Sequence, residues 1–383
     1  MAVRTPVKQV TGALSSRGDP ETTKRLARAF RVSEADGQVL LDGIHAVHPY
    51  PGRLHPIWAR RLFADLPANT SVVDPFCGAG TSLVEARLRG LHSRGSDINP
   101  VAVRLARLRV IPPPPADALR AEAARCAERC SRPRNTPFSA LAAGEEGFPR
   151  HVLATLIALR DEVQRTPDPR VREVLLFSLS PLLDKFAARL DRPAPRVATG
   201  TVVAHFTARV ERWIETFTAL SGCPWGEAEA ADARRLPWKA ASSGAALTSP
   251  PYAGVFDYTG VQERRARWLA APDELMQQSA DHEIGRRGGG GSRYGAWSMA
   301  MGDALGQLSR VLAPGSPCWI VVGDGVEQRD PVWADEVLET ICRALPFEFA
   351  GVVSQERPHF HRPSQQAFAY RPRREHLLEL RRR

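Results

Sequence analysis

The sequence of 383 residues lacks any apolar run of the roughly 18–20 residues that a transmembrane helix needs. Its opening residues, MAVRTPVKQVTGALSSRGD, contain no continuous apolar stretch, so they do not resemble a secretory signal. The six cysteines follow no disulfide spacing, and Cys126 and Cys130 have no second pair or nearby histidine to complete a zinc site. We therefore expect a cytoplasmic protein with reduced thiols, no metal and no membrane contact.

Lysine is also scarce, with four residues against 48 arginines. Lysine and arginine together number 52 and the acids 42, so the formal net charge is +10. A basic balance favours a polyanionic partner, above all nucleic acid. A chain rich in arginine and alanine is also typical of a GC-rich coding background, however, so charge alone does not identify the partner.

The spacing of apolar residues and turns predicts an alternation of strands and helices. We expect a short helix near 21–30, a buried strand over 70–75, a helix over 81–89, a second strand over 91–97 and a helix over 100–109. The last four elements, in the order βαβα, are typical of the start of a doubly wound α/β sheet.

The proline run at 112–115 ends this pattern, and residues 116–226 have the apolar spacing of helices. Strand signals then return. Residues 310–325 predict a helix end, a turn and a buried strand, and the segments 348–355 and 366–372 predict an antiparallel hairpin. The helical segment therefore interrupts one α/β domain.

A glycine-containing turn, DPFCGAGT at 74–81, lies between the first predicted strand and its helix. Gly78 and Gly80 let the backbone approach a ligand and expose N–H groups, and the helix N-terminus favours a carboxylate or phosphate. Asp97 ends the next strand, where an acid typically accepts hydrogen bonds from ribose hydroxyls. The turn fits neither GxGxxG nor a P-loop, because neither Gly-x-x-Gly nor Gly-Lys-Ser/Thr spacing follows.

A second motif, TSPPY at 248–252, combines acceptors with a flat ring. Two prolines remove backbone donors and leave carbonyls free to accept hydrogen bonds. The hydroxyl of Ser249 is a further acceptor, and the ring of Tyr252 offers a stacking face. Acceptors beneath an aromatic plane suit the exocyclic amine of a planar base.

Together, these two motifs resemble those of the S-adenosylmethionine-dependent amino-methyltransferases of DNA, which methylate cytosine at N4 or adenine at N6. The chain matches the family's cofactor motif D-P-F-x-G-[SA]-G-T throughout. The serine form of the family's [DNS]-P-P-[YFW] motif is most often found in N4-cytosine members. The resemblance covers roughly 45–110 and 228–380.

The resemblance implies a Rossmann-like class I methyltransferase sheet, here with a C-terminal antiparallel hairpin and a mostly helical insertion. It also implies S-adenosylmethionine as the cofactor and duplex DNA with a flipped cytosine as the partner. The expected divisions are an N-terminal extension (1–45), a cofactor-binding half (46–115), the helical insertion (116–226) and a catalytic half with a basic tail (227–383). Whether the insertion reads DNA or packs against the core stays open, as do a cognate restriction enzyme and a dimer partner.

The family's site residues can be assigned to matching positions of this chain. The acceptors of the second motif would polarise the amine, which then attacks the sulfonium methyl group in line. Phe256 or Tyr258 would contact the extruded base or simply belong to the core. The implied catalytic residues are Ser249, Pro250, Pro251 and Tyr252, and the implied cofactor-binding residues are His48, Tyr50, Asp74, Pro75, Phe76, Gly78, Gly80, Thr81, Asp97 and Asp232.

Two basic segments are candidates for contacts with the DNA backbone. One is the glycine-rich loop at 285–295, and the other is 354–383, which has eight arginines against three glutamates. Solvated surface charge is the alternative explanation for both. The predicted nucleic-acid contacts are Arg286, Arg287, Arg293, Arg357, His359 and Arg362.

Several other functions compete with N4-cytosine methylation. The same motifs suit N6-adenine methylation of DNA, methylation of an RNA base, or a non-catalytic nucleic-acid-binding module that senses the cofactor. Carbon-5 methylation needs a cysteine nucleophile, typically after proline, and Cys318 follows Pro317. A buried cysteine is the simpler explanation, since Cys318 opens an apolar strand far from the second motif. His359 and His361 have no third ligand placed near them, so we expect no metal there.

Overall fold

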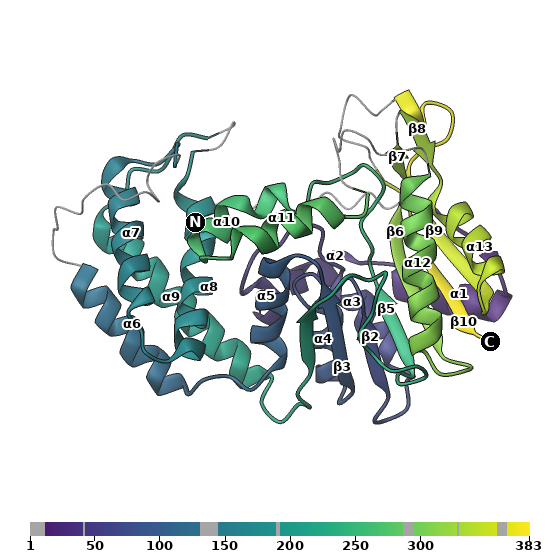
Figure 1. Cartoon of the computed structure of the whole chain (residues 1–383), viewed down its shortest axis with the longest axis horizontal. Coiled ribbons are helices and arrows are strands. Elements are labelled where there is room, and N and C mark those ends of the chain that lie inside the picture. Colours follow the sequence, from purple (N-terminus) through teal and green to yellow (C-terminus); the bar gives the residue numbers. More distant parts are fainter. Residues whose placement is uncertain are drawn as a thin grey trace.

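A computed structural model describes residues 12–40, 43–130, 145–188, 192–285, 295–327, 329–357 and 366–383. Its centre is an eight-stranded mixed sheet in the order β1-β9-β10-β6-β5-β2-β3-β4 (Figure 1). Strands β4, β3, β2, β5 and β6 are parallel, β10 is antiparallel to both β6 and β9, and β1 is antiparallel to β9. The strands are β1 Leu14–Gly18, β2 Ser71–Asp74, β3 His92–Asp97, β4 Glu227–Ala230, β5 Ala245–Thr248, β6 Pro317–Gly323, β9 Phe347–Glu356 and β10 Arg374–Arg382, with a separate ribbon of β7 Gly325–Glu327 and β8 Asp330–Val332.

The structure confirms the predicted doubly wound start of the sheet. Strand β2 leads through the glycine turn into α4 (Thr81–Leu88), and β3 leads into α5 (Pro100–Val110). Asn99 caps α5 by accepting hydrogen bonds from two backbone N–H groups, and Pro100 takes the first helical position, where no donor is needed. The parallel order β3-β2-β5-β6 places the switch in strand order beside β2, where α/β proteins bind ligands.

The predicted hairpin is present, but its second strand was assigned to the wrong segment. Strand β9 pairs with β10, and the expected segment 366–372 precedes it as a short helical turn and bends. Pro372 cannot donate to a strand ladder. Strand β10 lies between β9 and β6 with both faces covered, so Leu377, Leu378 and Leu380 are all fully buried and the alternation that marks a half-buried strand is absent.

Helices cover both faces of the sheet. On one face lie α1 (Pro20–Phe30), which matches the predicted helix, α3 (Pro56–Phe63) and α4. The opposite face carries α12 (Ala296–Val311) and α13 (Ala334–Ala344). The N-terminal strand β1 extends the same sheet at the β9 edge, so residues 14–18 belong to the α/β layer.

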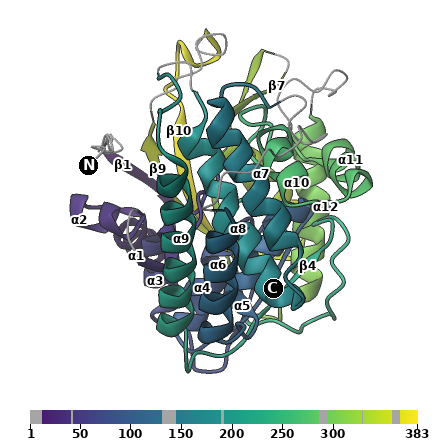
Figure 2. The same ribbon diagram turned by 90° about the vertical axis from the view of Figure 1, so that its left-hand side faces the viewer.

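The helical insertion lies beyond the β4 edge of the sheet (Figure 1). Its helices pack side by side (Figure 2), and their core is continuous with Val101, Leu105 and Leu108 of α5. Among the described helices, none is both long and apolar enough to cross a membrane. The helices of the insertion are α6 Ala116–Cys130, α7 Arg150–Gln164, α8 Pro169–Phe186 and α9 Thr199–Ala219.

Candidate functional site

A cavity of about 680 Å³ opens at the carboxyl ends of the parallel strands. Helices α10 (Glu263–Trp268) and α11 (Asp273–His282) lie across this edge of the sheet (Figure 1). The cavity joins the two sequence motifs, which are about 170 residues apart, because β2 and β5 are adjacent parallel strands. Eight predicted site residues line it: Tyr50, Pro75, Phe76, Gly78, Asp97, Asp232, Ser249 and Pro251.

The glycine turn requires glycine at two positions. Gly78 has φ 50° and Gly80 has φ 80°, both in the left-handed region. A Cβ at Gly78 would lie 3.4 Å from the ring of Tyr50, and one at Gly80 would lie 3.2 Å from the Cβ of Ala106. Gly78 therefore forms part of the cavity wall, whereas Gly80 allows α4 to pack against α5.

Asp97, at the end of β3, is hydrogen-bonded to the glycine turn. Its Oδ2 accepts a hydrogen bond from the N–H of Gly78 at 2.9 Å, and its Oδ1 accepts one from the N–H of Asn99 at 2.8 Å. One of the predicted free N–H groups of the turn is therefore already used. Burial raises the pKa of Asp97 to about 6. Each carboxylate oxygen can accept a further hydrogen bond, which suits a diol such as a ribose.

Asp74 ties the two motifs together. Its carboxylate accepts hydrogen bonds from the Phe76 N–H at 3.1 Å, the Thr248 hydroxyl at 2.6 Å and the Ser82 hydroxyl. Burial raises its pKa to about 6. Asp74 and Thr81 border a smaller adjoining cavity of about 310 Å³, which shares Tyr50 and other walls with the main one. The sequence pattern did not indicate this link between the two motifs.

The second motif divides between the cavity and the protein interior. Ser249 lines both cavities, and Pro251 lines the larger one, while its carbonyl accepts a hydrogen bond from Trp297 Nε1 at 2.7 Å. Pro250 is buried. The hydroxyl of Tyr252 donates to Glu375 Oε1 at 2.9 Å. Burial, reinforced by the charge of Glu375, holds the pKa of Tyr252 well above its ordinary value, so the hydroxyl keeps its proton.

His48 does not reach either cavity. It is fully buried, its Nε2 lies 2.7 Å from the hydroxyl of Ser180, and its ring meets the edge of Phe177 on α8. Burial lowers its pKa well below the usual value, so it is neutral. In this structure, His48 fastens the segment before α3 to the helical insertion. The residues of that segment that line the larger cavity are Tyr50, Pro51 and Gly52.

Asp232 follows β4 and lines the cavity on the side away from Ser249's strand. Its Oδ2 accepts a hydrogen bond from Arg234 Nη2 at 2.6 Å. Burial opposes ionisation of Asp232, but the hydrogen bonds from Arg234 outweigh this effect and lower its pKa. The carboxylate therefore stays ionised beside the cavity.

Glu283 lines the cavity, although the sequence assigned it no role. Its carboxylate accepts hydrogen bonds from the N–H groups of Tyr258 at 2.8 Å and Thr259 at 2.9 Å, and from the Thr259 hydroxyl at 2.6 Å. It thereby joins the end of α11 to the loop after the second motif, and both Tyr258 and Thr259 line the cavity. The local sequence HEIG at 282–285 does not by itself indicate this role.

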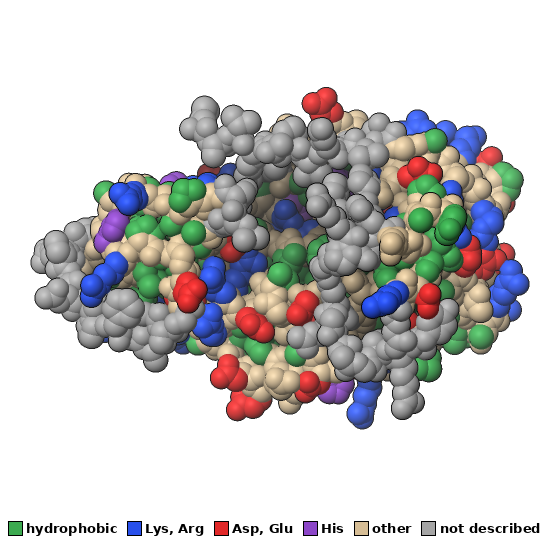
Figure 3. All heavy atoms as spheres, turned by 90° about the horizontal axis from the view of Figure 1, so that it is seen from above, with side chains coloured by type: hydrophobic (Ala, Val, Ile, Leu, Met, Phe, Trp, Pro, Cys, Tyr) green, Lys and Arg blue, Asp and Glu red, His purple; other side chains and the backbone are tan. Residues whose placement is uncertain are grey.

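Most of the predicted nucleic-acid contacts lie outside the described residues: Arg286, Arg287, Arg293, His359 and Arg362. Arg357 is described, and its Nε donates to Glu375 Oε2 at 2.9 Å. The segment 374–382 is strand β10, and Arg381 and Arg382 at its end already have partners within the protein. On the described part of the face above the cavity, basic side chains are interspersed with acidic ones (Figure 3).

Cys318 is an unsuitable nucleophile. It lies within β6, is fully buried, and burial raises its pKa above the ordinary value for a thiol. A nucleophilic cysteine needs an accessible thiolate. The structure therefore gives no support to carbon-5 methylation.

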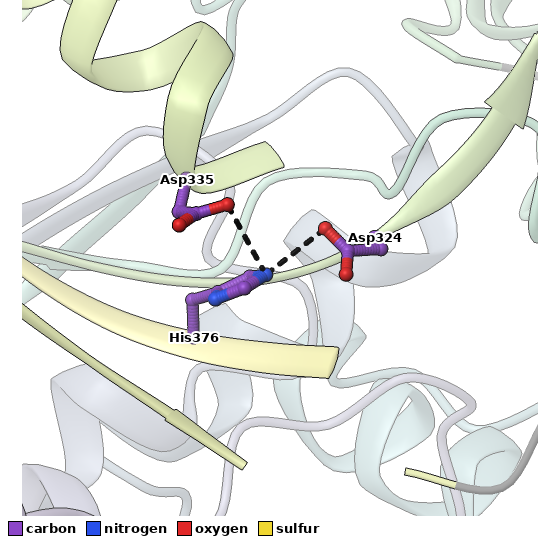
Figure 4. A group of neighbouring side chains, drawn as sticks. All are labelled: Asp324, Asp335 and His376. Carbon is purple, nitrogen blue, oxygen red and sulfur yellow. Dashed lines mark hydrogen bonds and ion pairs between the residues drawn. The ribbon is translucent and has the colours of Figure 1, made fainter. Parts of the chain in front are cut away.

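Asp324, Asp335 and His376 form a buried group that the sequence did not reveal (Figure 4). His376 Nε2 lies 3.0 Å from Asp324 Oδ1 and 3.8 Å from Asp335 Oδ1. These side chains are metal-ligand types, but two backbone N–H groups and two guanidinium groups already meet the carboxylates. We interpret the group as an ion-pair network that fastens β10 to β6 and α13. The protein groups that meet the carboxylates are the N–H groups of Ala334 and Arg374 and the side chains of Arg17 and Arg371.

The comparisons with known proteins give partial matches. No family model matches the chain. Type II methyltransferase M.MvaI of Kocuria varians is 37% identical over 82 residues, which are 20% of this chain and 18% of the relative. Type II methyltransferase M.MjaII of Methanocaldococcus jannaschii is 32% identical over 71 residues, 18% of this chain and 13% of the relative. The matches thus span less than a fifth of these relatives' length.

Among solved structures, a SAM-dependent methyltransferase from Methanosarcina mazei is 10% identical with a TM-score of 0.34, over 84% of this chain and 96% of its own. Over these two short segments, the chain is similar in sequence to type II methyltransferases.

Proposed function

We propose that this protein is an S-adenosylmethionine-dependent DNA methyltransferase that methylates the exocyclic N4 amine of cytosine. One observation carries the proposal: a single cavity is lined by residues of the glycine turn, by Asp97, and by Ser249 and Pro251 of the second motif. The partial similarity to two type II methyltransferases supports the same class of activity.

The residues of the cavity fit the cofactor. The turn at Gly78 leaves space that a Cβ would fill, and Asp97 offers carboxylate oxygens for the ribose hydroxyls. Ile98 and Ile284 would provide apolar walls for the adenine, and Asp232 lines the same cavity. When bound, S-adenosylmethionine supplies an electrophilic methyl group on a sulfonium.

The second motif would act on the target amine. An exocyclic amine is a poor nucleophile because its lone pair is delocalised into the ring. The hydroxyl oxygen of Ser249 and the carbonyl of Pro250 would accept hydrogen bonds from the amine and raise its reactivity. Neither proline can donate, so this backbone does not compete for the lone pair. The ring of Tyr252 would offer the stacking face for the extruded base. Its hydroxyl donates to Glu375, so the ring rather than the hydroxyl would contact the base.

The direct test is methyl transfer from labelled S-adenosylmethionine to duplex DNA, with the digested nucleosides identified by mass. We expect N4-methylcytosine, and we expect Ser249→Ala to lower kcat by roughly 100-fold or more while cofactor binding persists. N6-methyladenine would retain the enzyme class and overturn the target. Label found only in RNA would overturn the DNA substrate, and cofactor binding without any transfer would favour a binding module.

A further inference from the structure

Tyr252 follows the cavity-lining Pro251 but lines neither cavity itself, and its hydroxyl meets a charged residue of the β9–β10 hairpin. The Tyr252 hydroxyl donates to Glu375 Oε1 at 2.9 Å, and Glu375 Oε2 accepts from Arg357 Nε at 2.9 Å. The guanidinium of Arg373 lies 6.0 Å from the centre of the Tyr252 ring. Its Nε donates to the carbonyl of Asp324 at 2.8 Å, so its position is also fixed.

The ring is enclosed as well as hydrogen-bonded. A Cβ at Gly323 would lie 2.7 Å from a ring carbon of Tyr252, so the end of β6 passes directly along the ring. A glycine at this position is required by that approach. The contact with β6 and the hydrogen bond to Glu375 together restrict both the tilt and the rotation of the ring.

The chain neighbours of Glu375, Arg374 and His376, both form hydrogen bonds with Asp324. Asp324 Oδ2 accepts from the N–H of Arg374 at 2.9 Å, and Asp324 Oδ1 lies 3.0 Å from Nε2 of His376 (Figure 4). The other ring nitrogen of His376 lies 2.7 Å from the hydroxyl of Ser354 on β9. The residues before and after Glu375 are therefore both attached to Asp324, which fixes where the carboxylate of Glu375 lies.

Packing alone does not require this arrangement. A phenylalanine would fill the same space without a buried hydroxyl, and removing a carboxylate and a guanidinium from water has a desolvation cost. What the chain of hydrogen bonds adds is a defined ring orientation. Polar groups in a protein interior can specify geometry in this way, at some cost in stability.

We propose that Glu375 is a positioning residue that, held by Arg357, orients the ring of Tyr252 toward the target base. This inference rests on the proposed function, because it assigns the oriented ring to base stacking. A displacement of a reacting group by about 1 Å can lower a rate about 100-fold. Glu375 itself touches neither cavity, so its contribution would come entirely through Tyr252.

The orientation can be measured without activity. We would label the five tyrosines with 3-fluorotyrosine and assign the ¹⁹F signal of Tyr252 from its loss in Tyr252→Phe. We expect the Tyr252 signal to shift or broaden in Glu375→Ala and to return close to its original position in Glu375→Gln, which keeps an acceptor oxygen. An unchanged signal in Glu375→Ala would overturn the proposal, even if the protein transfers no methyl group.

The catalytic consequence is tested by kcat and cofactor Kd. We expect Glu375→Ala to lower kcat about 10- to 100-fold, with the cofactor Kd changed less than twofold. Tyr252→Phe should lower kcat to a similar extent, and the double variant should lose no more than either single one, because both changes break the same bond. Glu375→Gln should recover most of the rate.

A matched control is the pair Arg104–Glu173, which joins α5 to α8. Its side chains are 22% and 24% exposed, against 22% and 18% for Arg357 and Glu375. Glu173→Ala should leave kcat within twofold. Additive losses in the double variant, or an equal loss of kcat in Glu375→Gln and Glu375→Ala, would overturn the positioning role. Absence of transfer by the unaltered protein would overturn the proposed function instead, and the ¹⁹F result would still decide the orientation.

Discussion

At the scale of single residues, the two acids bonded to the glycine turn, buried Asp74 and partly buried Asp97, have different tasks. Asp74 accepts hydrogen bonds from three protein donors. Among the described residues, two backbone N–H groups donate to Asp97, which lines the cavity and so has capacity for a ligand. Burial raises the pKa of both to about 6, which makes their ionisation sensitive to mildly acidic pH.

The raised pKa of Asp97 predicts that cofactor binding weakens in acid. Protonation below about pH 6 removes negative charge and acceptor capacity where the ribose hydroxyls would bind. We expect the Kd for S-adenosylmethionine, measured by titration calorimetry, to rise as the pH is lowered from 8 to 5. Asp97→Asn should bind weakly at pH 8 and show little change over that range. A wild-type Kd that is constant from pH 8 to 5 would contradict this assignment.

Substitutions at Gly80 and Gly90 distinguish the cost of backbone strain from the cost of a steric contact. Both have positive φ, 80° and 78°, but a Cβ at Gly80 would meet Ala106 at 3.2 Å, whereas none of the described atoms lies within 4 Å of a Cβ at Gly90. Gly90→Ala adds only backbone strain, about 1 kcal/mol. Gly80→Ala adds the contact as well, so we expect it to lower the free energy of unfolding by about 2–3 kcal/mol. Urea denaturation of both variants would check the difference, and equal losses would refute the packing role of Gly80.

At the scale of elements, the cavity has one wall from the sheet and another from α11. The parallel strands supply the glycine turn, Asp97 and Ser249, while Ser279, His282 and Ile284 come from α11 and the residues just after it. Glu283 links the end of this helix to the loop at 257–260, together with a hydrogen bond of 3.1 Å between the Thr259 and Ser279 hydroxyls. The enclosure of the cavity therefore depends on a side chain outside both motifs.

This link predicts a binding defect away from the motifs. Glu283→Ala leaves the N–H groups of Tyr258 and Thr259 without their carboxylate partner, so the loop keeps only its weaker hydroxyl contact with Ser279 among these bonds to α11. We expect the cofactor Kd to rise about 10-fold, with the free energy of unfolding reduced by about 1–3 kcal/mol. Glu283→Gln retains an acceptor oxygen, so its cofactor Kd should lie between those of the unaltered protein and Glu283→Ala. Binding of the cofactor by Glu283→Ala with wild-type affinity would show that the loop needs no such attachment.

At the scale of the whole molecule, the helical insertion and the sheet share one interior. Val101, Leu105 and Leu108 of α5 belong to the same buried cluster as the insertion helices, and His48 bonds to α8. An insertion joined only by a linker would be free to unfold by itself. Here the shared core couples the two parts.

We therefore expect one cooperative transition when the full chain is heated in a calorimeter, with the van't Hoff enthalpy equal to the calorimetric enthalpy. Leu105→Ala should lower the temperature of that single transition, because it opens a cavity between α5 and the insertion. Two separated transitions in the unaltered protein would show that the insertion is an independent unit.

Local sequence was sufficient to predict the βαβα start, because periodicity, Asn99 and Pro100, and the glycines of the turn act over a few residues. It also predicted eight of the residues that line the cavity, since the carboxyl ends of adjacent parallel strands meet at one edge. Only the tertiary structure decided that His48 points into the helical insertion, that Asp74 joins the motifs and that Glu375 lies behind Tyr252. Those contacts join residues far apart in the chain, so they leave no periodic signal, and β10 was misplaced because a strand buried on both faces does not alternate.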